Sequence, residues 1–363
     1  MDGGEIHQIR LSEQPFDSVF HPTSHVIAAG LITGKIEVFE YSETAVRPLH
    51  AFTAHTDSCR GVCFSSDGLM LLSASADKSI LSTDANSGQA IARLENAHSD
   101  GINALRMISP SVIATGDDSG GIKVWDVRQQ ICCAHYEGHH EDFIADFEYS
   151  ETKNLLLAVS GDGTMSAMDL RNTSQILGRS ENQEDELLSV VFMKGESKVV
   201  CGSQGGILNI FSTGTWDDIS DRFPGHPQSV DTLVKIDDET LFSGSSDGMI
   251  RVVSVLPNKL LGVVGEHMDC PIERLALSPD YRLLSSVSHD NTIKLWDVGY
   301  ITHEEEASPA PPQGATSVPS PAFEQAEEAM EDSDEEPKGK KEKKKKKDKG
   351  NIAPKNNFFQ DLL

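Results

Sequence analysis

The sequence predicts an all-β protein built from seven similar units, because matching strands recur at even spacing and each unit shares one internal layout. The clearest strand is Ile122–Asp126, which follows a glycine-rich turn in this 363-residue chain. The matching strands can be aligned on their last residues, which lie 42 to 44 residues apart. Such a period indicates a repeat architecture. The strands end at Glu40, Asp84, Asp126, Asp169, Ser212, Ser254 and Asp297.

Within each unit the apolar pattern is that of short strands joined by turns. The first strand of a unit alternates apolar and polar residues, as residues 272–277 do. The second strand ends in small residues, as residues 241–245 do. A tight turn with Asp or Gly then leads into the closing strand, and these residue types tolerate the positive φ of short hairpins. One such sheet cannot bury both faces alone. Seven packed radially can, so we expect a seven-bladed β-propeller.

Several units resemble the WD-repeat family. Gly225-His226 followed by residues 243–248 matches its pattern, as do residues 285–297, and the resemblance covers about residues 5–300. It implies four-stranded blades. We therefore expect a seven-bladed WD-repeat β-propeller over residues 1–301 and a disordered tail over 302–363. Too few residues follow Asp297 for an outer strand, so residues 5–11 are expected to close the last blade.

The tail is predicted to be disordered from its composition. A Pro-, Ser- and Ala-rich stretch precedes an acidic stretch and then a lysine block. The block predicts a nuclear or nucleolar address and a weak RNA contact, although a solubilising tail is the alternative. The apolar end is a candidate docking peptide or a frayed terminus. These residues are Lys338, Lys340, Lys341, Lys343, Lys344, Lys345, Lys346, Lys347 and Lys349, then Phe358, Phe359 and Leu362.

The composition limits the kinds of partner and cofactor that we expect the protein to bind. A net charge of −26 disfavours general phosphate binding and suits basic protein partners, although acidity can also serve solubility alone. The six cysteines form no CxxC motif, so we expect no metal and no other cofactor. The sequence has neither a signal-like start nor an apolar run near the ~20 residues that span a bilayer. We expect a soluble intracellular protein with no membrane partner.

Histidines at a fixed place in their units indicate an internal hydrogen-bond network like that of the resembled family. The expected members are His226, Asp247, His267, Asp290 and Trp296, with Ser286 between the last three. A Ser-His-Asp catalytic reading is rejected, because buried polar groups need partners and the network supplies them. No phosphate loop or nucleophile motif occurs either. We expect no enzyme activity, no catalytic residue and no small-molecule substrate.

Two successive units end in Asp-x-Arg: Trp125 and Asp126 with Arg128, then Asp169 with Arg171. This pattern resembles propellers that dock on the damaged-DNA-binding adaptor of cullin-4 ubiquitin ligases. A fixed surface arginine could bind such a partner through two parallel hydrogen bonds. The alternative is that each Arg pairs with a carboxylate on its own surface.

The seven units, closing strand, lysine block and terminal Phe-Phe-x-Asp-Leu together resemble the WD-repeat protein 55 family. That resemblance implies a nuclear and nucleolar protein acting in ribosomal RNA synthesis or processing, with the cytoplasm as a further location. Its plant members also look like cullin-4 substrate receptors. Two functions remain: a scaffold that binds ribosome-assembly factors, and a ligase receptor that docks through Arg128 and Arg171.

Overall fold

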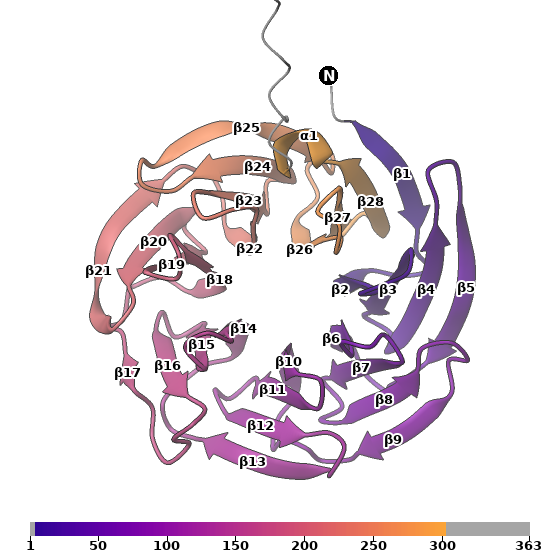
Figure 1. Cartoon of the computed structure of the whole chain (residues 1–363), viewed down its shortest axis with the longest axis horizontal. Helices are drawn as coiled ribbons and strands as arrows, with labels where there is room; N and C mark the ends of the chain where they lie inside the picture. The colour runs from indigo at the N-terminus through magenta and orange to yellow at the C-terminus, as the bar shows by residue number, and fades with distance from the viewer. Residues whose placement is uncertain (1–3, 303–363) are drawn as a thin grey trace, which may run out of the picture. The chain divides into compact units, whose positions relative to one another are not determined.

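The protein is a seven-bladed β-propeller, which confirms the predicted fold class. The computed structural model describes residues 4–302, and these form seven four-stranded antiparallel sheets around a central channel (Figure 1). The only helix in this range is α1 (Gly299–Thr302). The lysine block and the apolar terminal residues predicted as functional lie outside the described residues.

In the first four blades the strands follow one another from the channel to the outer edge. Blade 1 holds β2 (Pro15–Phe20), β3 (Val26–Leu31), β4 (Lys35–Tyr41) and β5 (Val46–Thr53). Blade 2 holds β6 (Cys59–Phe64), β7 (Met70–Ser75), β8 (Ile80–Asp84) and β9 (Ala90–Leu94). Blade 3 holds β10 (Ile102–Ser109), β11 (Val112–Asp117), β12 (Ile122–Asp126) and β13 (Ile131–Tyr136). Blade 4 holds β14 (Ile144–Ser150), β15 (Leu155–Ser160), β16 (Met165–Asp169) and β17 (Gly178–Arg179).

The remaining blades keep this order, except that the last takes its outer strand from the start of the chain. Blade 5 holds β18 (Leu187–Met193), β19 (Lys198–Ser203), β20 (Ile207–Ser212) and β21 (Thr215–Pro224). Blade 6 holds β22 (Val230–Lys235), β23 (Thr240–Ser245), β24 (Met249–Ser254) and β25 (Lys259–Glu266). Blade 7 holds β26 (Ile272–Leu277), β27 (Leu283–Ser288), β28 (Thr292–Asp297) and β1 (Glu5–Arg10).

The ring closes through β1, which pairs antiparallel with β28 so that Ile9 lies opposite Ile293. Ile9 is buried with Val287 and Ile293, whereas its neighbours Gln8 and Arg10 are exposed. This alternation is what a strand with one buried face requires. Leu11 continues the contact through its backbone, because its N–H donates to the Asn291 carbonyl at 2.9 Å.

All seven innermost strands carry a β-bulge at their second residue or its equivalent, where one residue has no partner on the next strand. A bulge redirects a side chain and increases the local twist. The bulged residues are Phe16, Arg60, Asn103, Ala145, Leu188, Asp231 and Glu273.

Strand direction defines two faces of the ring. We call the face where the innermost strands begin the entry face, and the face where they end the exit face. Because neighbouring strands are antiparallel, the third strand of each blade also ends on the exit face. The turns between second and third strands, and the connections between blades, lie on the entry face.

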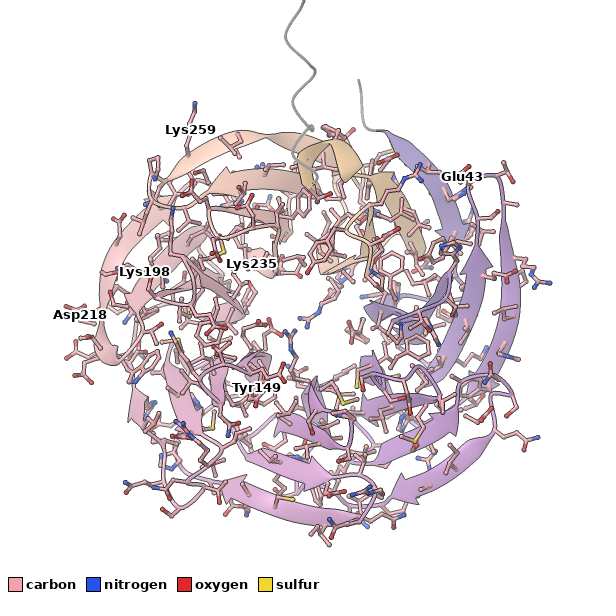
Figure 2. The ribbon with its side chains drawn as sticks, in the orientation of Figure 1. Glu43, Tyr149, Lys198, Asp218, Lys235 and Lys259 are labelled. Carbon is pink, nitrogen blue, oxygen red and sulfur yellow. The ribbon has the colours of Figure 1, made fainter. Side chains whose placement is uncertain are left out.

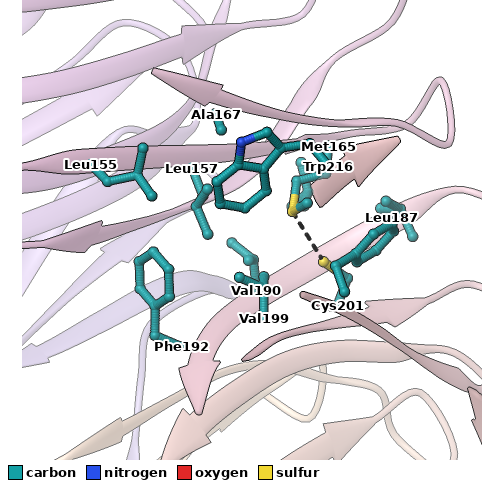
Figure 3. Close-up of a cluster of buried hydrophobic side chains, with 12 residues drawn as sticks. Leu155, Leu157, Met165, Ala167, Leu187, Val190, Phe192, Val199, Cys201 and Trp216 are labelled. Atoms are coloured by element: carbon teal, nitrogen blue, oxygen red, sulfur yellow. Dashed lines mark hydrogen bonds between the residues drawn. The ribbon is translucent and has the colours of Figure 1, made fainter. Parts of the chain in front are cut away.

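Apolar side chains between neighbouring blades form the core. Between blades 4 and 5, Trp216 from the outer strand β21 packs with Leu157, Met165 and Cys201 (Figure 3). The sulfur atoms of Cys201 and Met165 are 3.8 Å apart. Polar side chains project from the outer strands instead, as Asp218 and Lys259 do in Figure 2.

Candidate functional site

Blade 7 contains the predicted hydrogen-bond network in full. His267 Nδ1 lies 2.8 Å from Asp290 Oδ2, and its Nε2 lies 2.7 Å from Ser286 Oγ. Trp296 Nε1 donates to the same Ser286 oxygen at 2.9 Å. The four side chains join the blade connection, the second strand, the tight turn and the third strand. They therefore hold four elements of one repeat unit together.

Blade 3 contains a second full network, in which a threonine takes the place of the serine. His98 contacts Asp117 at 2.8 Å and Thr115 at 2.7 Å, and Trp125 Nε1 donates to Thr115 Oγ1 at 2.9 Å. Trp125 was predicted as a docking residue because of the motif that it begins. The residue is 8% exposed and its side-chain N–H is bonded inside the blade, so in this structure Trp125 helps to build the blade.

Blade 6 differs from the prediction. His226 Nε2 contacts Ser243 Oγ at 2.8 Å, but its Nδ1 has no hydrogen-bond partner among the described residues. The expected partner Asp247 instead accepts two hydrogen bonds from Arg251, at 2.9 and 2.6 Å. The predicted contact between His226 and Asp247 is therefore wrong: the arginine competes successfully for the carboxylate.

The electrostatics of these networks favour neutral histidines. Burial lowers the pKa of His267, although Asp290 opposes the effect. Burial and the nearby Arg251 lower the pKa of His226 to about 4. His267 is fully buried and the Ser286 hydroxyl already bonds both His267 and Trp296. This serine has no access to a substrate, so the networks serve the fold.

The first Asp-x-Arg segment places an unpaired arginine on the exit face. Asp126 accepts backbone hydrogen bonds from Arg128 at 3.0 Å and Gln129 at 2.9 Å, and the Gln129 side chain donates at 2.8 Å. These contacts fix the turn after β12. The Arg128 side chain is exposed, and its guanidinium forms no hydrogen bond or ion pair within residues 4–302.

The second copy, after β16, is occupied by its own carboxylate. Arg171 makes a two-point contact with Asp169, with Nε to Oδ1 at 2.8 Å and Nη2 to Oδ2 at 2.7 Å. This contact lowers the pKa of Asp169 to about 2. The turns after β12 and β16 lie on the same face in adjacent blades. Their arginines nevertheless differ: the Arg128 guanidinium forms no hydrogen bond or ion pair within residues 4–302, whereas that of Arg171 is paired with Asp169.

An ion cluster with two buried aspartates and a partly buried arginine crosses the channel and was not predicted. Arg274 on β26 contacts Asp146 on β14 at 3.0 Å and Asp17 on β2 at 3.5 Å. Asp146 and Asp17 raise the pKa of Arg274, which stays charged, whereas burial raises the pKa of Asp17 to about 6. The three residues line two cavities, of about 240 Å³ towards the entry face and 460 Å³ towards the exit face.

Across residues 4–302, no three His, Cys, Asp or Glu side chains are arranged to hold a metal ion. In the same range, no helix has the length and apolar character needed to cross a membrane.

Seven radial blades, Trp-Asp strands and buried His networks define the class of the protein: a WD-repeat propeller. A family model for WDR55 matches residues 6–301, and the chain belongs to the WDR55 family. It is 43% identical to WD repeat-containing protein 55 of Arabidopsis thaliana over 310 residues, 85% of this chain and 87% of the relative. The human WD repeat-containing protein 55 is 40% identical over 78% of this chain and 74% of its own length. The WD repeat-containing protein JIP5 of Coprinopsis cinerea is 40% identical over 82% of this chain and 75% of its own length.

Proposed function

We propose that the protein is a non-catalytic scaffold that acts in the nucleus and nucleolus in ribosomal RNA synthesis and processing, and so in ribosome biogenesis. The observation that carries the scaffold role is that the Ser-His-Asp sets are closed inside the blades. The two faces of the ring are surfaces on which such a scaffold could bind partners. An acidic propeller suits basic partners such as ribosome-assembly factors. The lysine block supports the nucleolar assignment by its composition.

The lysine block gives the first test. Replacing its nine lysines with glutamine in the full-length chain should disperse the protein from the nucleolus and cause precursor ribosomal RNA to accumulate. The matched control replaces the same lysines with arginine, which keeps the charge and should preserve both properties. Imaging of the tagged protein and RNA blotting measure the outcome. Normal localisation and normal precursors in the glutamine variant would contradict the proposal.

A second candidate function is favoured by Arg128 alone. We propose, as the alternative, that the protein is a cullin-4 substrate receptor that docks on the damaged-DNA-binding adaptor through the exit face. The support is an exposed guanidinium on a turn held by three hydrogen bonds to Asp126. Such a group can bind a partner carboxylate without first breaking an internal pair.

The two arginines allow a matched test of this alternative. Arg128→Ala should reduce co-purification of the adaptor at least tenfold, whereas Arg171→Ala should have a smaller effect because Arg171 is already bonded to Asp169. Arg128→Lys keeps the charge but loses the planar two-point contact, so we expect it to bind weakly. Equal co-purification of the wild type and Arg128→Ala would rule out this docking mode.

A further inference from the structure

The outer edge of blade 6 carries an apolar strand that no other part of the described chain covers. β25 is the last strand in the order of this blade, so its outer edge has no strand partner within residues 4–302 (Figure 1). Leu260, Leu261 and Val263 on this strand are 41%, 52% and 50% exposed. No other strand in the described range has more than one exposed large apolar side chain. The blade therefore presents both open backbone and apolar surface at its rim.

The outer strands of the other blades are protected against pairing, whereas β25 is not. Charged side chains, proline and very short strands are the usual means of protection, because they keep another strand from pairing with the exposed backbone. Between its charged ends β25 has an uninterrupted run, residues 260–265, with no charged residue, histidine or proline. No other outer strand in the described range has a run of this length. The protective features there are Arg47 and Pro48 in β5, Arg93 in β9, His135 in β13, Asp218 in β21, His7 in β1 and the two-residue length of β17.

Gly262, in the middle of this run, is not required by the chain itself. Its φ is not positive, and a Cβ added there would meet no atom within 4 Å. At every other glycine within a strand of the described range, an added Cβ would meet an atom at less than 3.0 Å. Glycine weakens the interior of a strand and often marks a place where another backbone approaches closely. Gly262 therefore points to a partner outside the chain.

The sequence around Gly262 has the pattern that two copies of one strand need in order to pair with each other. Two apolar residues precede the glycine and two follow it, and Lys259 and Glu266 lie at opposite ends of the strand. Neither charged side chain forms an ion pair within residues 4–302, and Figure 2 shows Lys259 pointing away from the ring. Glu266 uses its backbone carbonyl, which accepts a 2.9 Å hydrogen bond from Lys294. A two-fold axis reverses the strand, so it brings each lysine near the glutamate of the other copy.

We propose that β25 pairs antiparallel with β25 of a second copy of this chain, around a two-fold axis at Gly262. The axis places Gly262 opposite Gly262 of the second copy, and Leu261 opposite Val263 of the second copy. Bulges at Leu261 and Val264 increase the twist of the strand, and the two-fold axis gives both copies the same twist. The pairing satisfies backbone groups on both edges and covers apolar side chains of both copies. This interface goes beyond the proposed function, because it lies on the rim and leaves both faces of the ring free for other partners.

Gly262 allows a sharp test, because a side chain added there has room in one copy but faces its equivalent across the axis. Gly262→Lys and Gly262→Asp each place two like charges directly opposite one another, which is destabilising in a sheet. An equal mixture of the two variants places a lysine opposite an aspartate instead. Val263→Lys introduces a charge into the apolar edge. Ile91→Lys makes the same kind of change at an exposed residue of the outer strand β9 and is the matched control.

Sedimentation velocity of the full-length protein over a concentration series at physiological salt measures the association, and thermal unfolding checks that every variant is folded. We expect the wild type to show an equilibrium between monomer and dimer that depends on concentration. Gly262→Lys, Gly262→Asp and Val263→Lys should each weaken the dimer at least tenfold. The mixture of the two Gly262 variants should dimerise as the wild type does, and Ile91→Lys should behave like the wild type.

The proposal is overturned if the wild type is a monomer at millimolar concentration, even if an extended apolar peptide of another protein binds to β25. It is also overturned if Gly262→Lys dimerises like the wild type, as association through residues 338–349 would predict. Failure of the mixture to restore the dimer, or an equal loss in Ile91→Lys and Val263→Lys, contradicts it as well. None of these results depends on nucleolar localisation, so the inference and the proposed function can fail separately.

Discussion

At the scale of single residues, the same network positions carry different chemistry in different blades. His267 uses both ring nitrogens, to Asp290 and Ser286, whereas His226 uses only Nε2 because Arg251 occupies Asp247. A buried nitrogen without a partner costs free energy, which makes His226 a weak point of the fold. Its charged form would also face the guanidinium of Arg251.

His226 should therefore make the stability of the propeller depend on pH. Its pKa is about 4 in the folded state, against roughly 6.5 when unfolded. Between these values the unfolded state binds more protons, so stability is complete above pH 6.5 and falls as the pH drops towards 4. At pH 4.5 the titration of His226 lowers the free energy of unfolding by about 2–3 kcal/mol relative to its value above pH 6.5. His226→Gln removes the titrating group. Urea unfolding at pH 7 and 4.5 should therefore show a drop in the free energy of unfolding that is about 2–3 kcal/mol larger for the wild type than for the variant. Parallel losses in both proteins would contradict this assignment.

At the scale of single elements, β1 decides whether the ring is closed. It covers the edge of β28, which would otherwise expose unpaired backbone groups. Only one of its central side chains is buried, because Ile9 faces the core while Gln8 and Arg10 face solvent. Within β1 the closure therefore depends mainly on Ile9, and the buried Leu11 follows directly after the strand.

Ile9→Ala should destabilise the propeller by about 2–5 kcal/mol, the usual range for a buried isoleucine reduced to alanine. Gln8→Ala, one position away on the same strand but exposed, should change stability by less than about 0.5 kcal/mol. Chemical denaturation of both variants measures the difference. Similar small effects in both would show that β1 is not anchored through its buried face.

Part of this structure could be predicted from local sequence signals. The period predicted the seven blades, and the alternation of residues 5–11 pointed to the closing strand. The network of His267 was predictable from the resemblance to the WD-repeat family, whose pattern its members match at fixed places in one unit. Contacts between units were not predictable. Arg274 pairs with Asp146, which is 128 residues earlier, and no local pattern links them. The difference between Arg128 and Arg171 depends on side-chain conformation, which a shared motif does not specify.

At the scale of the whole molecule, Arg274 links blade 7 to the neighbouring blade 1 and, across the channel, to blade 4. Contacts between adjacent blades make the ring, but the ion pair of Arg274 with Asp146 joins two blades that are not neighbours. The three residues of the cluster also line both cavities of the channel. Loss of the guanidinium would leave two buried carboxylates without their cation.

Arg274→Met should therefore destabilise the protein by about 3–5 kcal/mol at pH 7. The stability difference between Arg274→Met and the wild type should be smaller at pH 5. The reason is that the pKa of Asp17 is about 6 even beside Arg274 and rises further without the arginine. A protonated Asp17 no longer needs a cation, so the variant regains stability as the pH falls below that value. Arg274→Lys keeps a positive charge and serves as the control. Urea unfolding at the two pH values is decisive, and an equal deficit at both would contradict the assignment.

Proximity labelling of the full-length protein in nuclei tests the central claim most directly, because it scores ribosome-assembly factors against cullin-4 ligase subunits in one measurement. A scaffold acting in ribosome biogenesis should label ribosome-assembly factors strongly, and Arg128→Ala should leave that set unchanged. A set dominated by ligase subunits that disappears in Arg128→Ala, with no ribosome-assembly factor enriched, would contradict the claim.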